Sequence, residues 1–373
     1  MYFSHVLKSK KIALSLILGV FLTFCTCKTF AIQPEHAAET EQPAHGEHAA
    51  EGEHEEAFNP SEVILEHIAD SHSIHLWGTT SIALPVVLYT DKGLEVFSSA
   101  NFEHGHKDFG GKYYTYRLVK DKVAIVEGAD SLLPAATLLS LNKKLIDISI
   151  TRNVVSMWMS MLIIFIIFLS VSSAYKKRQG KAPKGLQSFI EPIIMFVRDD
   201  IARPNIGYKY ERFMPLLLTV FFFIWVNNLI GLVPFFPGGA NLTGNIAVTF
   251  VLSLITLLVV NLNGNKYYWK HIFAPDVPVW LYPIMWPVEL VGIISKPFAL
   301  MIRLFANITA GHIIVLSLIS LIFVFKAASV AFVSVPFVVF MDVLELLVAA
   351  LQAFIFTLLT ALFIGTAIEE HHH

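Results

Sequence analysis

One stretch of the sequence decides how the rest is interpreted: KPFALMIRLFANITAGH, which runs from Lys296 to His312. It places Arg303 inside an otherwise apolar helical run, with His312 nine residues further on. An ionised side chain at membrane depth costs at least about 2.5–3.5 kcal/mol. Such a residue usually faces protein, water or a counter-charge, so Arg303 is the first candidate functional residue.

The composition is that of an integral membrane protein. Of the 373 residues, 55% are hydrophobic and 15% are charged, and the mean hydropathy is +0.62. Soluble domains are about 45–50% apolar and about 25% charged. Clusters of Lys and Arg interleaved with aromatic residues are absent from the sequence, which argues against nucleic acid as a partner.

The first 31 residues have the pattern of a secretory signal peptide. Three lysines precede the apolar run 12–27, and Ala31 offers a small-residue cleavage site. The alternatives are an uncleaved anchor helix and, with a poorer match, a lipoprotein signal through Cys25. Cleavage after residue 31 would remove both cysteines, so we expect no disulfide and no thiol chemistry.

Residues 32–60 are rich in Ala, Glu, His and Pro and hold almost no large apolar side chains. Such a segment cannot bury enough surface to offset the entropy of ordering, so we expect a disordered tether. Histidines interleaved with glutamates leave loose metal binding or proton buffering as the alternative.

Residues 61–150 change character and predict a small β-containing domain. The strand pattern 84–89, the turn 90–93 and the strand pattern 94–97 predict one hairpin. A second hairpin is predicted from 113–119 and 123–127. The histidines of this domain lack metal-ligand spacing, and we expect them at the surface; they are His67, His72, His75, His104 and His106.

Residues 151–373 predict the membrane domain of an all-α polytopic membrane protein. The uncharged run 154–174 is long enough to cross a hydrocarbon core of about 30 Å. Five lysines and arginines follow within 176–184, so that end is expected in the cytoplasm and the N-terminal domain outside the cell. The predicted crossings are 154–174, 213–236, 246–262, 287–325 and 335–368, with an amphipathic interfacial helix at 186–201.

The last two predicted helices are too long to cross the membrane upright. At 1.5 Å per residue, 287–325 spans about 58 Å and 335–368 spans about 51 Å. We expect both to tilt strongly and to form an antiparallel hairpin joined by an outer loop at 326–334. The acidic C-terminus then lies in the cytoplasm.

Arg303 lies on a stripe of small residues. With 100° per residue on a helical wheel, four small or polar residues fall within about 60° of it. Small residues allow another helix to approach closely, so a partner helix that carries a carboxylate is the natural counter-charge. An arginine paired within this chain is the alternative. The four residues of the stripe are Ala299, Ala306, Asn307 and Ala310.

The final helix supplies polar residues at matching depths. Glu345 and Gln352 are seven residues apart and share one face. In two antiparallel helices, the residue numbers rise along one helix while they fall along the other. Two residues at the same depth therefore have numbers that add up to nearly the same sum. By this rule Gln352 should lie level with Arg303, and Glu345 level with His312. A Glu–His pair suits a proton relay, since histidine titrates near neutrality. On an ideal wheel His312 lies opposite Arg303, so contact between His312 and Glu345 is left open.

Several motifs resemble subunit a of F-type ATP synthases. The resemblance covers about 180–370 and is most specific in the last 85 residues. It is carried by Glu289-Leu290-Val291-Gly292, Ser295-Lys296-Pro297, Arg303-Leu304-Phe305-Ala306-Asn307, Ala310-Gly311, Leu351-Gln352-Ala353-Phe354-Ile355-Phe356 and Glu369-Glu370-His371.

The resemblance implies roles for individual residues. Arg303 would be the essential arginine that faces the rotating c ring, and Glu289 would lie near the cytoplasmic half-channel. The expected outer proton pathway consists of Asn228, Asn307, His312, Glu345 and Gln352.

Two departures from the family pattern stand out. Some bacterial members carry the acid on the first of the two long helices and the histidine on the second, whereas His312 and Glu345 exchange these places here. Gly231 stands where some members have an aspartate.

The resemblance also implies partners and location. We expect a stator subunit in a bacterial inner membrane, in contact with the c ring, the b-subunit peripheral stalk, other ATP synthase subunits and membrane lipid. It would provide two offset half-channels for protons, with no catalysis by itself, no cofactor and no metal.

Other function classes fit the sequence less well. A secondary ion transporter or a proton-driven motor subunit is the alternative, but such folds tend to show internal repeats that this sequence lacks. An intramembrane zinc protease would need a His-Glu-x-x-His helix, and His312 has no such neighbours. The sequence leaves open the coupling ion, the ring size, the role of 32–150 and the origin of His371–His373.

Overall fold

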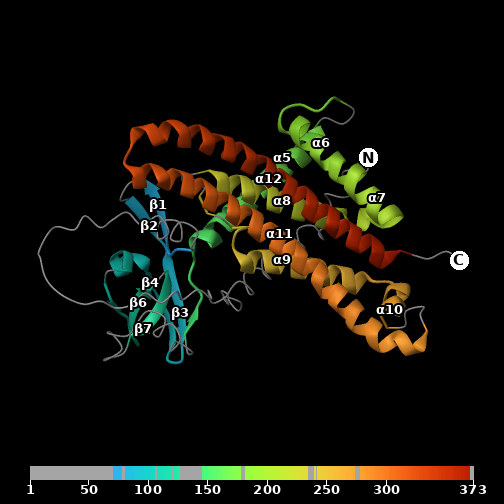
Figure 1. The fold of residues 1–373 in the computed structure, drawn as a ribbon, viewed down its shortest axis with the longest axis horizontal. Coiled ribbons are helices and arrows are strands. Elements are labelled where there is room, and N and C mark those ends of the chain that lie inside the picture. Colours follow the sequence, from blue (N-terminus) through green and yellow to red (C-terminus); the bar gives the residue numbers. More distant parts are fainter. Residues whose placement is uncertain are drawn as a thin grey trace, which may run out of the picture.

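The computed structural model describes residues 70–77, 80–105, 107–119, 121–126, 145–177, 181–233, 239–240, 242–273 and 278–369. The predicted signal peptide (1–31) and tether (32–60) lie outside these residues. Five helices in the described part of the chain are long and apolar enough to cross a membrane. The protein is therefore a multi-pass membrane protein with a β-containing N-terminal region (Figure 1).

The described residues of the N-terminal region form three small antiparallel sheets, β1-β2, β4-β3-β8 and β5-β6-β7. Both predicted hairpins are present, as β3-β4 and β6-β7. Their turns place Gly93 (φ +135°) and Asp121 (φ +60°) in the left-handed region, which a tight hairpin turn requires. The elements are β1 (Ser73–Trp77), β2 (Thr80–Ala83), β3 (Pro85–Thr90), β4 (Gly93–Ser98), the short helix η1 (Ser99–Gly105), β5 (Phe109–Gly110), β6 (Thr115–Val119), β7 (Lys122–Val126) and β8 (Ile146–Asp147).

A buried carboxylate joins the two larger sheets. Glu95 of β4 is 5% exposed and accepts hydrogen bonds from the backbone N–H groups of Lys112 and Tyr113 and from the Tyr116 hydroxyl. The apolar core beside it is formed by Val86, Leu88 and Phe102 with Tyr116. Because a buried charge is tolerated only when it is fully hydrogen-bonded, Glu95 fixes how the sheets meet.

His72 contradicts our expectation that the histidines of this region lie at the surface. Its side chain is 4% exposed, and its Nε2 lies 3.3 Å from Asp147 Oδ2. Burial alone would raise the pKa of Asp147, but the nearby His72 ring and the hydrogen bonds from Ser149 hold that pKa below its usual value. Asp70 and Ser71 next to it accept hydrogen bonds from the start of the first membrane helix. His72 is buried because it lies where the β-containing region meets the start of the first membrane helix.

The membrane region is a bundle of helices with bounds close to those expected. Helix α8 ends at Leu232 rather than at the expected residue 236, because Val233, which precedes Pro234, has an extended backbone. The elements are α5 (Arg152–Lys177), α6 (Leu186–Phe196), the π-helical segment η3 (Val197–Ala202), α7 (Arg203–Ile206), η4 (Gly207–Lys209), α8 (Tyr210–Leu232), α9 (Ile246–Asn263), α10 (Lys266–Phe273), η5 (Val279–Leu281), α11 (Tyr282–Phe325) and α12 (Ala328–Ile368).

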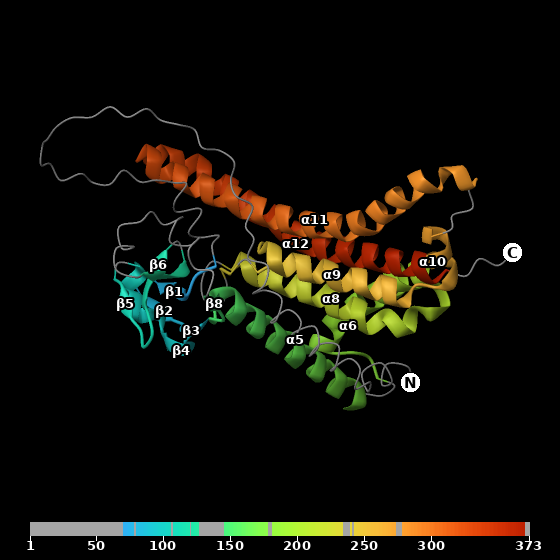
Figure 2. The same cartoon turned by 90° about the horizontal axis from the view of Figure 1, so that it is seen from below.

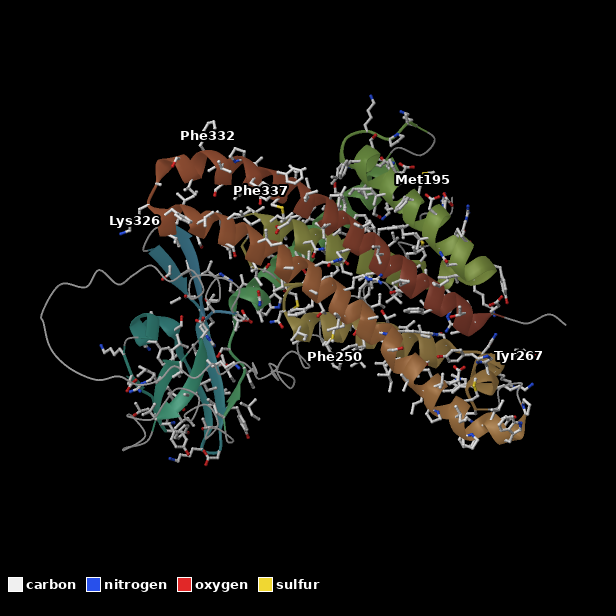
Figure 3. The ribbon with its side chains drawn as sticks, in the orientation of Figure 1. Met195, Phe250, Tyr267, Lys326, Phe332 and Phe337 are labelled. Carbon is white, nitrogen blue, oxygen red and sulfur yellow. The ribbon has the colours of Figure 1, made fainter. Side chains whose placement is uncertain are left out.

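The turn between α11 and α12 is much shorter than the predicted loop at 326–334. Helix α12 begins at Ala328, and Lys326 makes the turn with φ +45°. We expected the last crossing to begin at residue 335. Pro336 instead lies inside α12, where the buried Ser334 shows that packing holds the preceding turn. In Figure 3, Lys326 marks this turn, and Phe332 and Phe337 project from α12 next to it.

Helices α11 and α12 lie side by side over a layer formed by α8 and α9 (Figure 2). Helix α8 supplies much of the core, including Leu217, Phe222 and Ile224, each no more than 1% exposed. Toward its α10 end, α11 bends away from α12 (Figure 2). Pro297 lies in this stretch and lacks the N–H that would continue the helical hydrogen bonds, which accounts for the bend.

The two ends of the bundle differ. The β-containing region lies at the end where α5 begins and where α11 turns into α12, whereas α10 and the end of α12 lie at the other (Figures 1 and 2). Lysines gather at the α10 end, with Lys176 and Lys177 in the last turn of α5 and Lys270 in the last turn of α10.

The crossing of α12 over α7 generates a prediction. A methyl group at Gly365 would overlap the backbone carbonyl oxygen of Asn205, which cannot rotate away. We expect Gly365→Ala to destabilise the folded protein by about 1–3 kcal/mol through overpacking. The measurement is the thermal unfolding temperature of the purified protein in detergent.

Gly292→Ala is the matched control, since an added Cβ there meets nothing within 4 Å. It should leave stability unchanged or raise it by up to about 1 kcal/mol, because alanine favours a helix over glycine. Equal unfolding temperatures for the two variants would contradict the close packing of α12 on α7.

Candidate functional site

Arg303 projects from the outer face of α11. Leu300 and Leu304, which are 2% and 0% exposed, pack into the bundle and turn Arg303 outward. The described residues offer its guanidinium no hydrogen bond and no ion pair. The predicted stripe is exposed around it at Ala299, Ala306, Asn307 and Ala310.

Gln352 lies beneath Arg303, level with it as the residue numbers predict. It is 2% exposed, and its Nε2 donates to the backbone carbonyl oxygen of Arg303 at 3.4 Å. The contact therefore involves the backbone of Arg303 and leaves the guanidinium free to face a partner.

His312 and Glu345 come close to each other. Nδ1 of His312 lies 3.9 Å from Oε2 of Glu345, with side-chain exposures of 20% and 12%. On an ideal helical wheel this contact is not expected, and Gly311 explains how it forms. The Glu345 side chain passes over Gly311 so closely that a Cβ there would overlap its carboxyl group. The second carboxyl oxygen of Glu345 is buried and accepts no hydrogen bond.

Helix α8 packs against this pair. A Cβ built on Gly231 would lie 3.9 Å from Nε2 of His312 and 3.5 Å from the carbonyl oxygen of Ala240. The position where some family members carry an aspartate therefore adjoins the second ring nitrogen of His312.

Asn228 fixes the contact between α8 and α12. It is 3% exposed, donates to the backbone oxygen of Ala349 at 3.3 Å, and accepts from the Thr243 hydroxyl at 2.6 Å. Ala349 follows Glu345 by one helical turn, so Asn228 lies directly inward of the His312–Glu345 pair. Thr243 could not be identified from the sequence, because its partner Asn228 lies fifteen residues away on α8.

Asn307 does not join the His312–Glu345 pair. It lies exposed on the outer stripe beside Arg303, one turn further along α11. The structure thus divides the expected outer pathway into an inner-facing group, which is Asn228, His312, Glu345 and Gln352, and an outer-facing residue, Asn307.

Glu289 lies at the far end of α11. Its Oε1 is 3.7 Å from Nδ1 of His271 on α10, with side-chain exposures of 25% and 69%. Fourteen residues separate Glu289 from Arg303, a distance of about 21 Å along a helix. Lys296 lies halfway between them on nearly the same face. Sequence reasoning missed His271, whose partner is eighteen residues away.

In the described part of the chain, no three His, Cys, Asp or Glu side chains are grouped so that they could hold a metal ion.

Comparison with known proteins agrees with the geometry. The profile of the family described as ATP synthase A chain matches residues 154–365. The chain belongs to this family. The resemblance found in the sequence is thereby confirmed. Residues 63–148 match a second family, described as a domain of unknown function (DUF8433).

Relatives in several bacteria share the membrane region. ATP synthase subunit a of Chloroherpeton thalassium is 50% identical over 232 residues, which cover 61% of this chain and 69% of that protein. ATP synthase subunit a of Chlorobium phaeobacteroides (strain BS1) is 49% identical over 235 residues, covering 61% and 68% of the two chains. The Myxococcus xanthus subunit is 42% identical over 235 residues, covering 61% and 76%.

The hydrogen bonds of Asn228 generate a prediction. Thr243→Val removes the donor to a buried amide oxygen, which should cost about 1–3 kcal/mol of stability. Thr309→Val is the control, because its hydroxyl makes only a long contact of 3.5 Å to the backbone oxygen of Gly244. Thermal unfolding of both variants in detergent checks this, and an equal loss in the two would contradict it.

Proposed function

We propose that this chain is the stator subunit a of an F-type ATP synthase and carries protons to and from the ring of c subunits through two offset half-channels. One observation carries the proposal: Arg303 is exposed, has no ion-pair partner among the described residues, and is flanked by small residues on a long membrane helix of an ATP synthase family member. Its natural counter-charge is a carboxylate on another subunit, which the small residues allow to come near.

The outer half-channel runs past Glu345 and His312 toward Asn307 and the ring. Glu345 and His312 are close enough to exchange a proton after a small side-chain movement, and histidine titrates near neutrality. Asn228 and Gln352 supply polar side chains that line the buried side of this path. A proton delivered here neutralises a carboxylate of the ring. The neutral carboxyl group can then rotate with the ring into contact with lipid at a much lower free-energy cost than the ionised group.

Arg303 separates the two half-channels. Its guanidinium stays charged at any physiological pH, so it favours the ionised form of the ring carboxylate that reaches it and expels the proton. A fixed positive charge also repels a proton that would pass directly between the paths. The inner half-channel begins near Glu289.

The orientation follows from charge. Lysines gather at the α10 end of the bundle, which the positive-inside rule places in the cytoplasm. The β-containing region then lies outside the cytoplasm and the C-terminus inside, in a bacterial inner membrane. Within the assembled complex the partners are the c ring, the b-subunit peripheral stalk and the other subunits, with lipid around α5. An exposed, unpaired arginine does not favour a transporter that satisfies its charges internally.

The role of Arg303 is tested by substitution. In inverted membrane vesicles that contain the whole complex, Arg303→Ala should reduce ATP-driven proton pumping by about a hundredfold or more, since it removes the fixed charge. ATP hydrolysis by the assembled complex should remain. Fluorescence quenching of a pH-sensitive dye measures pumping.

Ser317→Ala is the control on the same helix, because this hydroxyl bonds only to the backbone of its own helix, at 2.7 Å. It should pump normally. Normal pumping by the Arg303→Ala variant in assembled complexes would contradict the proposal.

The Glu345–His312 pair is tested through Gly311. Gly311→Ala should push the Glu345 carboxyl group away from His312 without adding or removing a charge. Positioned proton-transfer groups contribute factors of about 10²–10⁴, so pumping should fall by about tenfold or more. Gly292→Ala, where an added Cβ meets nothing, is the matched control. Unchanged pumping in Gly311→Ala would show that the pair does not carry protons.

A further inference from the structure

We infer that His271 exchanges protons between Glu289 and the cytoplasmic water, and so forms the inner mouth of the proton pathway. The inference rests on the proposed function, because Glu289 carries protons only if that function holds. It assigns the inner pathway a second residue, on a different helix from Glu289.

The geometry brings one partly buried and one exposed titratable group together. Nδ1 of His271 lies 3.7 Å from Oε1 of Glu289. The Glu289 side chain is 25% exposed, whereas that of His271 is 69% exposed. A movement of less than 1 Å would bring the two atoms to ordinary hydrogen-bond distance, about 2.7–3.2 Å. His271 therefore stands between the carboxylate and bulk water.

Contacts on both sides hold α10 in this position. The Tyr268 hydroxyl donates to Oδ1 of Asn261 on α9 at 3.0 Å, and Nε1 of Trp286 on α11 donates to the backbone oxygen of Phe273 at 2.9 Å. A helix of eight residues would otherwise be marginal in water. Two anchors, one to each neighbouring helix, therefore fix His271 against Glu289.

The surrounding charges favour proton traffic through this pair. Burial, and after it the nearby Glu289 carboxylate, raise the pKa of Tyr268. This hydroxyl therefore stays neutral and does not exchange protons with Glu289 in place of His271. Lys270 lies beside His271 on α10, and Lys296 lies further along α11. In the described structure Glu289 faces His271 from α11, and the titratable side chains within four residues of His271 on α10 are Tyr267, Tyr268 and Lys270.

The proton balance is simple. During synthesis, protonated Glu289 gives its proton to Nδ1 of neutral His271, which leaves a carboxylate and an imidazolium. The imidazolium then loses the proton on Nε2 to water. Rotation of the exposed ring, or exchange of the Nδ1 proton with water, restores the starting tautomer. During hydrolysis the same steps run in reverse and load Glu289 from the cytoplasm.

The test uses whole complexes in inverted vesicles, whose cytoplasmic face is outward. Without His271, Glu289 must take protons directly from water, where they become scarce as the pH rises. His271→Gln should therefore pump about fivefold slower than the unaltered protein at about pH 8.5, with a much smaller loss at about pH 6, where protons are plentiful in the water. In a Glu289→Gln background, His271→Gln should cause no further loss.

Tyr267→Phe is the matched control. Tyr267 lies one turn from His271 on the same face of α10, is 52% exposed and is labelled in Figure 3. It should pump normally at every pH. Pumping by His271→Gln that equals the control, or a loss that is the same at all pH values, would overturn the inference, since a merely structural role gives a uniform loss. Arg303→Ala distinguishes the two ways in which this inference could fail. If His271→Gln and Arg303→Ala both pumped normally, the proposed function itself would be wrong. If His271→Gln pumped normally and Arg303→Ala did not, only the role of His271 would be wrong.

Discussion

A permanent charge on an apolar helix is the constraint on which this structure depends. The guanidinium of Arg303 cannot lose its proton, and no side chain in the described part of the protein neutralises it. Its helix turns it outward because Leu300 and Leu304 occupy the opposite, buried face. The cost of such a charge in lipid is offset only if a partner meets it. The exposed small residues beside Arg303 are therefore as much a part of the site as the charge itself, because they decide how closely that partner approaches.

The long helix α11 also sets the spacing of the proton groups. His312 lies about 13 Å from Arg303 along the helix in one direction, and Glu289 about 21 Å in the other. Each of these residues is completed from a different helix, His312 by Glu345 of α12 and Glu289 by His271 of α10. The bend near Pro297 carries the Glu289 end away from α12 and toward α10 (Figure 2). In the proposed function, one bent helix and its two neighbours would thus supply two separate proton pathways with a fixed charge between them.

Much of this could be predicted from the sequence, and the failures have physical causes. Hydropathy and length found the five membrane helices, and residue numbers placed Gln352 level with Arg303, because helical rise is regular. The contact between His312 and Glu345 could not be predicted, because an ideal wheel ignores how a side chain passes over the missing Cβ of Gly311. His72 was wrongly expected at the surface, because its burial depends on a junction between two regions. His271 carried no local signal, since its partner lies on the next helix.

The central claim is that another subunit supplies the counter-charge of Arg303. The most direct measurement is photo-crosslinking in the assembled complex, with a photoreactive amino acid at Ala306, which is exposed beside Arg303. The same probe at Phe332, which is 86% exposed on α12, serves as the reference position. The account predicts a crosslink from position 306 to the small ring subunit, identified by mass spectrometry, and no such product from position 332. Crosslinks from position 306 to lipid or to this chain alone would contradict it.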